Sequence, residues 1–361
     1  MRNFTSYIIG LALVTTGWSC KEVYYPEDIE SAEQIPVIQG MIHNDEVPSV
    51  NLSWALRYGD NFTEYISGAE IRVSDDLGNM VTLEEAGNGY YTKFSDEFKG
   101  EPGRTYTLYV RLPDGNEYVS SPEHLPEAPL IDSLYADPGT RKVYTYNSNN
   151  EPLSEIQEGL FILADLSDNA DSALYYRFST NTVKEITYTQ DPGSLAAKTV
   201  FVWETGTLGN FYSANHTIEY NNRQILREHP VGFLHFDYDG SLETERATAP
   251  YPEGWVLIFK VYSISEKAYN YYNSIAEQLG SNNQMFAPIP SQVKSTVRCL
   301  TDPEKDVIGV FEASAQTKIF KAFAWKDLEV YQAKDLQSFP EDLQNGSTLP
   351  FAPEFWVPFN Y

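Results

Sequence analysis

Three short segments decide the fold of this chain: AEIRVS at residues 69–74, DDLGN at residues 75–79 and MVTL at residues 80–83. The first segment alternates apolar and polar side chains, which predicts a strand with one buried face. The second segment predicts a turn, because Gly and Asn tolerate the positive φ angles that tight hairpins need. Residues 69–83 therefore predict a β-hairpin.

Comparable apolar runs continue on both sides of this hairpin, at intervals of about ten residues and separated by Gly or Asx turns. They lie at residues 37–42, 49–55, 90–94, 106–112 and 118–120. Short strands at this spacing are typical of a β-sandwich. We therefore predict an Ig-like β-sandwich over residues 35–122.

The rest of the chain predicts a second, larger β domain. Pro122, Pro126 and Pro129 follow the first sandwich, and this Pro-rich stretch predicts a domain boundary. Residues 131–361 again consist mainly of short apolar runs, with one helix near residues 265–280. The predicted fold class is mostly β, with two antiparallel β domains: an N-terminal Ig-like sandwich and a larger C-terminal β domain with one packed helix.

The predicted helix has recognisable start and stop signals. Ser263-Ile264-Ser265-Glu266 fits a capping box at its start, and Gly280 is the expected C-terminal stop. Between them the apolar residues on one face are Ala268, Tyr272, Ile275, Ala276 and Leu279. We interpret this face as packing on a sheet, with partner recognition as the alternative.

The N-terminus has the pattern of an export signal. A positive charge precedes the apolar residues 7–14, and this run is too short to cross a bilayer of about 30 Å as a helix. The sequence GWSC at residues 17–20 resembles a bacterial lipobox, although Trp18 departs from the small or aliphatic residues preferred there. We predict a signal peptide at residues 1–19 and lipid attachment at Cys20; a buried N-terminal helix is the alternative.

The chain is strongly acidic. It has 25 Lys and Arg against 51 Asp and Glu, which gives a net charge of −26. Such a charge repels phosphate backbones and anionic lipid head groups, so we expect no nucleic-acid partner. Residues 20–34 predict a lipidated acidic tether; they resemble an acidic export tag of Bacteroidetes surface lipoproteins, and a solvated linker is the equal alternative.

The sequence offers little catalytic chemistry. It has no G-x-S-x-G, H-E-x-x-H, Walker loop or G-x-G-x-x-G motif, so we expect a protein that is not an enzyme and has no cofactor. The best metal candidates are His235, Asp237 and Asp239, which would share one face of a strand. A simple hairpin turn at Asp239-Gly240 is the competing interpretation, and no metal is expected.

Two further sets of residues have a chemical and a structural interpretation. Asp165, Asp168 and Asp171 have oxygen ligands that suit calcium, but their spacing does not follow the calcium-loop pattern and a solvated turn explains them. The two cysteines of the chain leave no disulfide framework. Cys299 is predicted to be a small buried strand residue, with a nucleophile as the alternative.

Aromatic residues concentrate at the C-terminus. Pro353 and Pro358 exclude a regular helix over residues 351–361, so this segment would be extended. Burying even two aromatic rings contributes several kcal/mol before entropy is deducted, so we expect the segment to be ordered. It would lie across the second domain or insert into a partner through Phe351, Phe355, Trp356, Phe359 and Tyr361.

A set of segments distributed over the mature chain supports a family resemblance. They are Cys20, residues 36–40, 66–73, 89–91, 103–108, 175–178, 263–269 and 353–356. In order and spacing they resemble a Bacteroidetes lipoprotein family known as domain of unknown function 4249. The resemblance implies an outer-membrane lipoprotein that is usually encoded beside a TonB-dependent receptor. It implies no activity and no catalytic residues.

Together these features favour a non-enzymatic outer-membrane lipoprotein that is exposed at the cell surface. It would be an accessory or binding subunit of a TonB-dependent receptor or of another outer-membrane barrel protein. A surface adhesin or glycan-binding module is the alternative, motivated by the aromatic residues and turn-rich loops. The third hypothesis is an acidic hydrolase whose carboxylates meet only in the folded chain.

Overall fold

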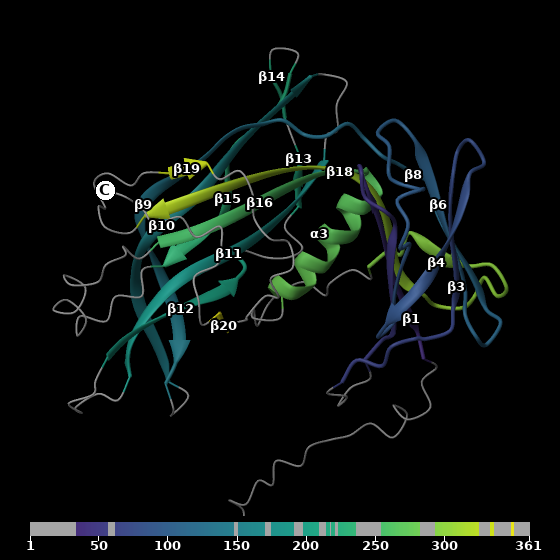
Figure 1. Ribbon diagram of the computed structural model, residues 1–361, viewed down its shortest axis with the longest axis horizontal. Helices are drawn as coiled ribbons and strands as arrows, with labels where there is room; N and C mark the ends of the chain where they lie inside the picture. The colour runs from purple at the N-terminus through teal and green to yellow at the C-terminus, as the bar shows by residue number, and fades with distance from the viewer. Residues whose placement is uncertain are drawn as a thin grey trace, which may run out of the picture.

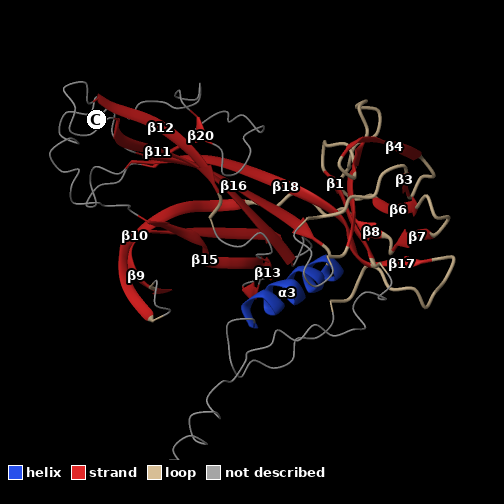
Figure 2. Ribbon diagram, turned by 90° about the horizontal axis from the view of Figure 1, so that it is seen from below, coloured by secondary structure: helices blue, strands red, loops and turns tan. Residues whose placement is uncertain are grey.

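The computed structural model describes residues 34–56, 62–147, 151–169, 175–190, 198–208, 214–216, 218–220, 223–235, 254–281, 293–324, 333–335 and 348–349. Within these residues the chain forms strands of two sheets and a helix (Figures 1 and 2). The predicted fold class, mostly β with a packed helix, is confirmed.

Short strands follow one another in the N-terminal part. They are β1 (Pro36–His43), β2 (Ser49–Trp54), β3 (Glu70–Asp75), β4 (Met80–Gly87), β5 (Tyr90–Thr92), β6 (Thr105–Arg111), β7 (Glu117–Ser120) and β8 (Glu123–His124). Their buried and exposed positions alternate as the sequence predicts, most regularly along β1 and β6.

The C-terminal part contains several longer strands and the helix. The strands are β9 (Ile131–Tyr146), β10 (Pro152–Asn169), β11 (Tyr175–Gln190), β12 (Lys198–Gly206), β13 (Ala214–His216), β14 (Ile218–Tyr220), β15 (Arg223–His235), β16 (Gly254–Ile264), β17 (Val297–Cys299), β18 (Ile308–Ala324), β19 (Ala333–Asp335) and β20 (Thr348–Leu349). The helix α3 spans Glu266–Ser281.

The large sheet runs through both parts of the molecule. Its order is β17-β7-β6-β3-β4-β5-β2-β1-β18-β16-β11-β12-β20, and the small sheet has the order β14-β15-β10-β9. Strands β1 and β18 join the two parts and are parallel, from Val37 opposite Ile308 to His43 opposite Ser314. This parallel pairing departs from the two antiparallel β domains that the sequence predicts, because the two strands come from distant parts of the chain and run in the same direction.

The hairpin predicted at residues 69–83 is confirmed, since β3 and β4 pair antiparallel. The carboxylate of Asp75 accepts hydrogen bonds from the backbone amides of Leu77 and Asn79, at 2.9 Å each. Gly78 has a φ of 85°, a conformation that side chains disfavour. The shape of this turn therefore depends on the carboxylate of Asp75 and on Gly78.

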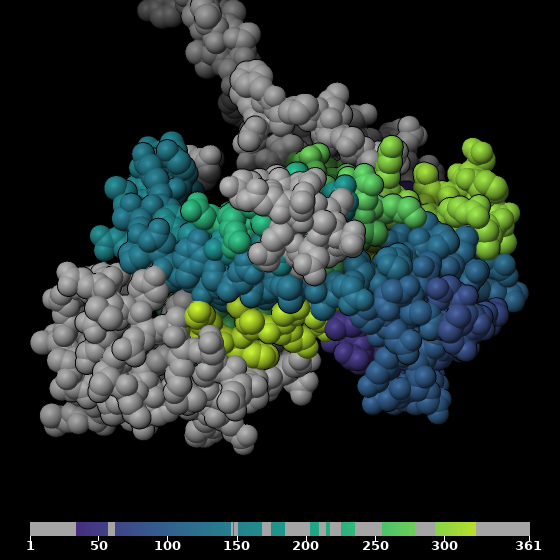
Figure 3. All heavy atoms as spheres, turned by 90° about the horizontal axis from the view of Figure 1, so that it is seen from above, coloured from purple at the N-terminus to yellow at the C-terminus, as the bar shows by residue number. Residues whose placement is uncertain are grey.

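Two parts of the chain that are distant in sequence contribute to the core of the first sandwich. Its buried residues include Ile38, Leu52, Ile71 and Leu108 from the N-terminal strands and Val297, Cys299, Phe311 and Ala313 from β17 and β18. In the space-filling view, blue atoms of the N-terminal part and yellow-green atoms from near residue 300 adjoin at one end of the molecule (Figure 3). The predicted range 35–122 thus omits β17 and the first part of β18, while the buried position predicted for Cys299 is confirmed.

Gly40 allows β1 to pack closely against β6 and β18. A Cβ atom on Gly40 of β1 would lie 2.8 Å from the side chain of Leu108 and 2.9 Å from that of Phe311. Real Cβ atoms do not approach other heavy atoms so closely, so a larger residue would displace both side chains. The contact between β1, β6 and β18 therefore depends on the absence of a side chain at position 40.

A second core lies between the two sheets of the C-terminal part. Leu134, Ile162 and Leu234 of the small sheet face Phe178 and Phe259 of the large sheet, and all five are buried. Figure 2 shows β10 and β15 as one layer beside β11, β16 and β18. This packing of two apolar sheet faces is the sandwich architecture of the C-terminal part.

The helix α3 lies beside the large sheet, near the place where the two parts meet (Figure 1). Ser265 Oγ accepts a hydrogen bond from the backbone amide of Ala268 at 3.2 Å, so Ser265 caps the helix. The predicted capping box at Ser263 is wrong, because Ser263 is a buried residue of β16. Ala268 and Tyr272 are buried, as predicted for the packed face. Among the residues described here, no helix is long and apolar enough to cross a membrane.

Candidate binding site

Most residues predicted to be functional lie outside the described residues. They are Cys20, Asp237, Asp239, Phe351, Phe355, Trp356, Phe359 and Tyr361. His235 ends β15, where its backbone pairs with Gly159, but its side chain is not described. The metal, lipid and aromatic-tail hypotheses therefore stay predictions. Where side chains are described, no group of three or more His, Cys, Asp or Glu residues is arranged to hold a metal ion.

The carboxylate of Asp165, a calcium candidate, is already engaged within the protein. Its Oδ2 accepts a hydrogen bond from Ser133 Oγ at 3.0 Å, and its Oδ1 accepts one from the backbone amide of Glu228 at 2.8 Å. Arg227 Nη1 lies 3.6 Å from the same carboxylate. Asp165 therefore holds β9, β10 and β15 together, beside a cation that the protein itself provides.

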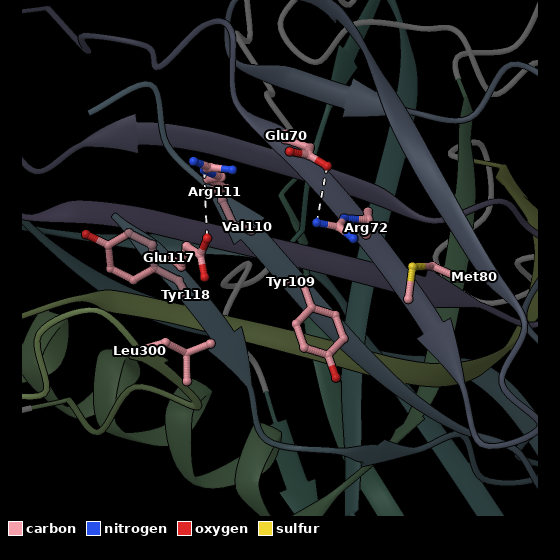
Figure 4. A pocket seen from close by; sticks show the side chains of 9 residues that line it. All are labelled: Glu70, Arg72, Met80, Tyr109, Val110, Arg111, Glu117, Tyr118 and Leu300. Carbon is pink, nitrogen blue, oxygen red and sulfur yellow. Dashed lines mark ion pairs between the residues drawn. The ribbon is translucent and has the colours of Figure 1, made fainter. Parts of the chain in front are cut away.

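A shallow pocket of about 150 Å³ lies on the outer face of the first sandwich (Figure 4). We call this surface, with the residues that line it, the Tyr109 face. The residues are Glu70, Arg72, Met80, Tyr109, Val110, Arg111, Glu117, Tyr118 and Leu300. They come from β3, β4, β6, β7 and the residue that follows β17, so parts of the chain that are distant in sequence build the pocket.

Strand register places the charged residues of the Tyr109 face in a row. Arg111 of β6 lies opposite Glu70 of β3 on one side and Glu117 of β7 on the other. Arg111 Nε is 3.8 Å from Glu117 Oε1, and Arg72 Nη2 is 3.2 Å from Glu70 Oε1. These four side chains are about half exposed, so the ion pairs contribute little to stability and remain able to bind a ligand.

Apolar groups lie between these ion pairs. The ring of Tyr109 stands opposite Arg72 in the register of β3 and β6. Met80 and Leu300 are exposed beside the pocket, and Figure 4 shows all three around the same depression. Tyr, Met and Arg are the residue types enriched in protein–protein interfaces. The Tyr109 face therefore offers ring stacking, apolar contact and charge-assisted hydrogen bonds.

A second polar constellation is fully buried where the two parts of the molecule meet. Arg177 of β11 binds Glu312 of β18 through two contacts, Nε to Oε2 at 2.9 Å and Nη2 to Oε1 at 2.8 Å. Their side chains are only 3% and 1% exposed. The guanidinium also lies over the rings of Tyr262, at 4.0 Å, and Tyr272, at 5.3 Å. This arrangement satisfies the charge of Arg177 from several directions.

The buried pair extends to β1 through one serine. Ser314 Oγ donates to Glu312 Oε1 at 2.6 Å, and His43 Nδ1 lies 2.8 Å from Ser314 Oγ. Because the hydroxyl has a single proton, which Glu312 receives, Nδ1 of His43 must be the donor. We call Arg177, Glu312, Ser314 and His43 the junction network. It connects β11, β18 and β1.

In the junction network, burial and neighbouring charges shift the pKa values of Glu312 and His43 in opposite directions. Burial alone would raise the pKa of Glu312, but the charge and hydrogen bonds of Arg177 hold that pKa at about 2. Burial lowers the pKa of His43, and the nearby carboxylate of Glu312 opposes this. Ser314 is completely buried, so it is not available to a substrate. We interpret the junction network as a structural connection between the parts rather than a catalytic site.

The sequence predictions missed both sites. Arg177 and Glu312 each follow a buried aromatic residue inside a predicted strand, and a charge within such an apolar run was the available signal. No comparable signal marked the Tyr109 face. Tyr109 occupies an ordinary outward position of a strand, and Leu300 reaches it only through the pairing of β17 with β7.

Comparisons with known proteins identify a family and nothing closer. Residues 22–319 match the family model described as Domain of unknown function (DUF4249). No curated protein and no solved structure gives a significant match.

Proposed function

Since the chain belongs to the family of domain of unknown function 4249, we propose that it is a non-enzymatic binding subunit of an outer-membrane complex. A lipid on Cys20 would hold it at the membrane, and the chain would face the cell exterior. The export signal, the GWSC sequence and the acidic residues after Cys20 support this location. The partner would be a TonB-dependent receptor or another outer-membrane barrel protein.

The observation that carries the binding role is the composition of the Tyr109 face. An exposed ring, a methionine and a leucine surround half-exposed arginine–glutamate pairs on a rigid sheet. Interfaces with protein partners are enriched in Tyr, Met and Arg, and strands present such groups without the entropy cost of ordering a loop. We propose that this face binds the partner.

A matched pair of variants tests this surface. The full-length protein and its variants are purified from outer membranes in detergent, and co-purified proteins are identified by mass spectrometry. Tyr109→Ala should lose most of an outer-membrane barrel protein that the parent retains. Tyr90→Ala should keep it, because Tyr90 is also a strand tyrosine of the first sandwich and is equally exposed, at 38%. Equal recovery with both variants would exclude the Tyr109 face as the binding surface.

Lipid anchoring is tested separately. Cys20→Ser removes the only thiol at the predicted attachment point, so the variant should leave the membrane fraction or remain uncleaved. The measurement is membrane fractionation of cells that lack the partner, so that no protein contact can retain the variant. A variant that still fractionates with outer membranes would show that no lipid at this position is needed.

A glycan-binding module is the second candidate, and one feature favours it. The exposed ring of Tyr109 lies beside guanidinium and carboxylate groups, which is an arrangement suited to stacking and hydrogen bonding with a sugar. Binding of the purified chain to an array of glycans tests it. Glycan binding that Tyr109→Ala abolishes, without any co-purified barrel protein, would replace the first proposal with this one.

A further inference from the structure

Several hydrogen bonds hold one end of the first sandwich together around the start of β1. The backbone amide of Ala55 donates to the carbonyl of Ile35 at 2.8 Å, and Gln34 Nε2 donates to Glu64 Oε2 at 3.0 Å. The amide of Trp54 donates to the carbonyl of Glu64 at 2.8 Å. The start of β1, the end of β2 and the residues before β3 therefore lie at the same end of the sandwich.

This end exposes large apolar side chains. Phe62 is 87% exposed, and Leu56 and Tyr65 are each more than half exposed. Tyr65 is fixed on the sandwich because it forms a bridge with Ser53 of β2. Single exposed apolar residues are common, but three at the same end of one sandwich favour a contact surface.

The number of residues between Cys20 and this end of the sandwich limits the distance between this end and the membrane. Fourteen peptide steps separate Cys20 from Gln34, and a chain of this length reaches at most about 50 Å when fully extended. If Cys20 is lipidated, Gln34 cannot be farther than this from the leaflet that holds the lipid. The opposite end of β1 lies about 25 Å farther along the strand. The end with Phe62 is thus the end of the sandwich that the chain reaches first from the proposed anchor.

We infer that Leu56, Phe62 and Tyr65 form a membrane-contact surface that inserts into the interfacial region of the leaflet to which the chain is anchored. This inference rests on the lipid anchor of the proposed function. The occupant is a zwitterionic or uncharged lipid surface, because the net charge of −26 opposes contact with anionic head groups. Aromatic rings with a polar tip, such as Tyr65, favour the membrane interface, and Phe62 and Leu56 supply the apolar area.

The inference can be tested without relying on lipidation by the cell. The mature chain, residues 20–361, is coupled through the Cys20 thiol to phosphatidylcholine vesicles that contain a small fraction of maleimide-headgroup lipid. Cys299 is buried, so coupling takes place at Cys20. Phe62→Trp provides a fluorescent reporter at the proposed surface, and its exposed position leaves the fold intact.

Phe94→Trp is the matched control. Phe94 is 68% exposed and follows β5, whose Thr92 lies opposite Ser49, at the other end of β2 from Trp54. On coupled vesicles the additional emission of Phe62→Trp should shift to the blue and be quenched by lipids brominated in their acyl chains. The emission of Phe94→Trp should do neither. Both effects should persist at high salt, since apolar contact rather than charge causes them.

Each outcome decides a different claim. If Phe62→Trp is quenched no more than Phe94→Trp, this end does not contact the membrane and the inference is wrong. The vesicle experiment attaches the chain chemically, so its result does not depend on whether cells lipidate Cys20. Fractionation of Cys20→Ser would reveal a failure of the proposed lipid anchor separately. Quenching at Phe94 instead of Phe62 would show that the sandwich has the opposite orientation.

Discussion

At the scale of single residues, the buried pair of Arg177 and Glu312 has the largest consequences. Both charges are removed from water, and their two short contacts offset that cost only while both partners are present. Ser314 transmits the contact to His43 of β1. The junction network therefore makes the position of three strands depend on one ion pair.

Replacing Arg177 by methionine should lower the free energy of unfolding by about 3–5 kcal/mol, because Glu312 would remain buried without its partner. The double variant Arg177→Met, Glu312→Leu should recover most of this loss, since no buried charge remains. Urea unfolding measures both. Arg111→Met removes a half-exposed ion pair and should cost less than about 1 kcal/mol. A double variant no more stable than the single one would contradict this account.

His229 should make stability depend on pH. Burial lowers the pKa of His229 from 6.5 to about 4, and its ring stacks on Phe178 with the centroids 3.9 Å apart. The folded state therefore binds this proton less readily than the unfolded state. The stability present above about pH 6.5 is lost as the pH falls towards 4, by up to about 3 kcal/mol.

The measurement is the free energy of unfolding of the parent and of His229→Gln between about pH 7 and pH 4. This range includes the pKa of His229 in both the unfolded and the folded state. The variant should lose less stability over this range than the parent. Parallel pH curves for the two proteins would show that His229 does not contribute.

At the scale of elements, local patterns predicted most strands of the first sandwich and the hairpin of β3 and β4, but not the pairing of strands that are distant in sequence. The apolar runs at residues 306–312 and 319–325 predict two separate strands, because residues 313–318 between them lack large apolar side chains, but β18 is continuous. The strand continues there since β16 pairs along most of it and β1 pairs with its first half. Tertiary pairing thus overrides a weak local signal, and no local pattern could indicate a pairing of residues so distant in sequence.

The start of α3 provides a test of the corrected cap. Ser265→Ala removes the hydroxyl that accepts from the amide of Ala268, so it should cost about 1 kcal/mol. Ser263→Ala should be close to neutral or stabilising, because its buried hydroxyl makes no hydrogen bond in the described structure. Thermal unfolding of the two variants measures the difference. A larger loss at position 263 than at 265 would restore the capping box that the sequence suggested.

At the scale of the whole molecule, the sequence predicted strands that carry the Tyr109 face but not the face itself. Alternation along β3 and β6 places Arg72 and Tyr109 outward, as expected for a half-buried sheet. Leu300 joins them only because β17, far along the chain, pairs with β7. The site is therefore a product of topology, and only its single strands were predictable.

The same topology predicts the result of limited proteolysis. Cleavage in the Pro-rich residues 122–131 should leave two fragments that remain associated, because β1 pairs with β18 and β7 pairs with β17 across the cut. Size-exclusion chromatography under native conditions should show one peak that contains both fragments. Two separately eluting folded fragments would instead show that residues 35–122 form an independent domain.

The parallel pairing of β1 with β18 also sets the order in which the chain can fold. Val37 pairs with Ile308, so β1 cannot pair with β18 until all the residues between them in the sequence have been synthesised. Closing so long a loop costs entropy before the contact stabilises anything, which makes folding slow. Until then one edge of β1 stays open to other strands, and such an edge promotes aggregation. The edge of β1 therefore needs protection from aggregation during synthesis of the chain, before any surface of the folded protein can bind a partner.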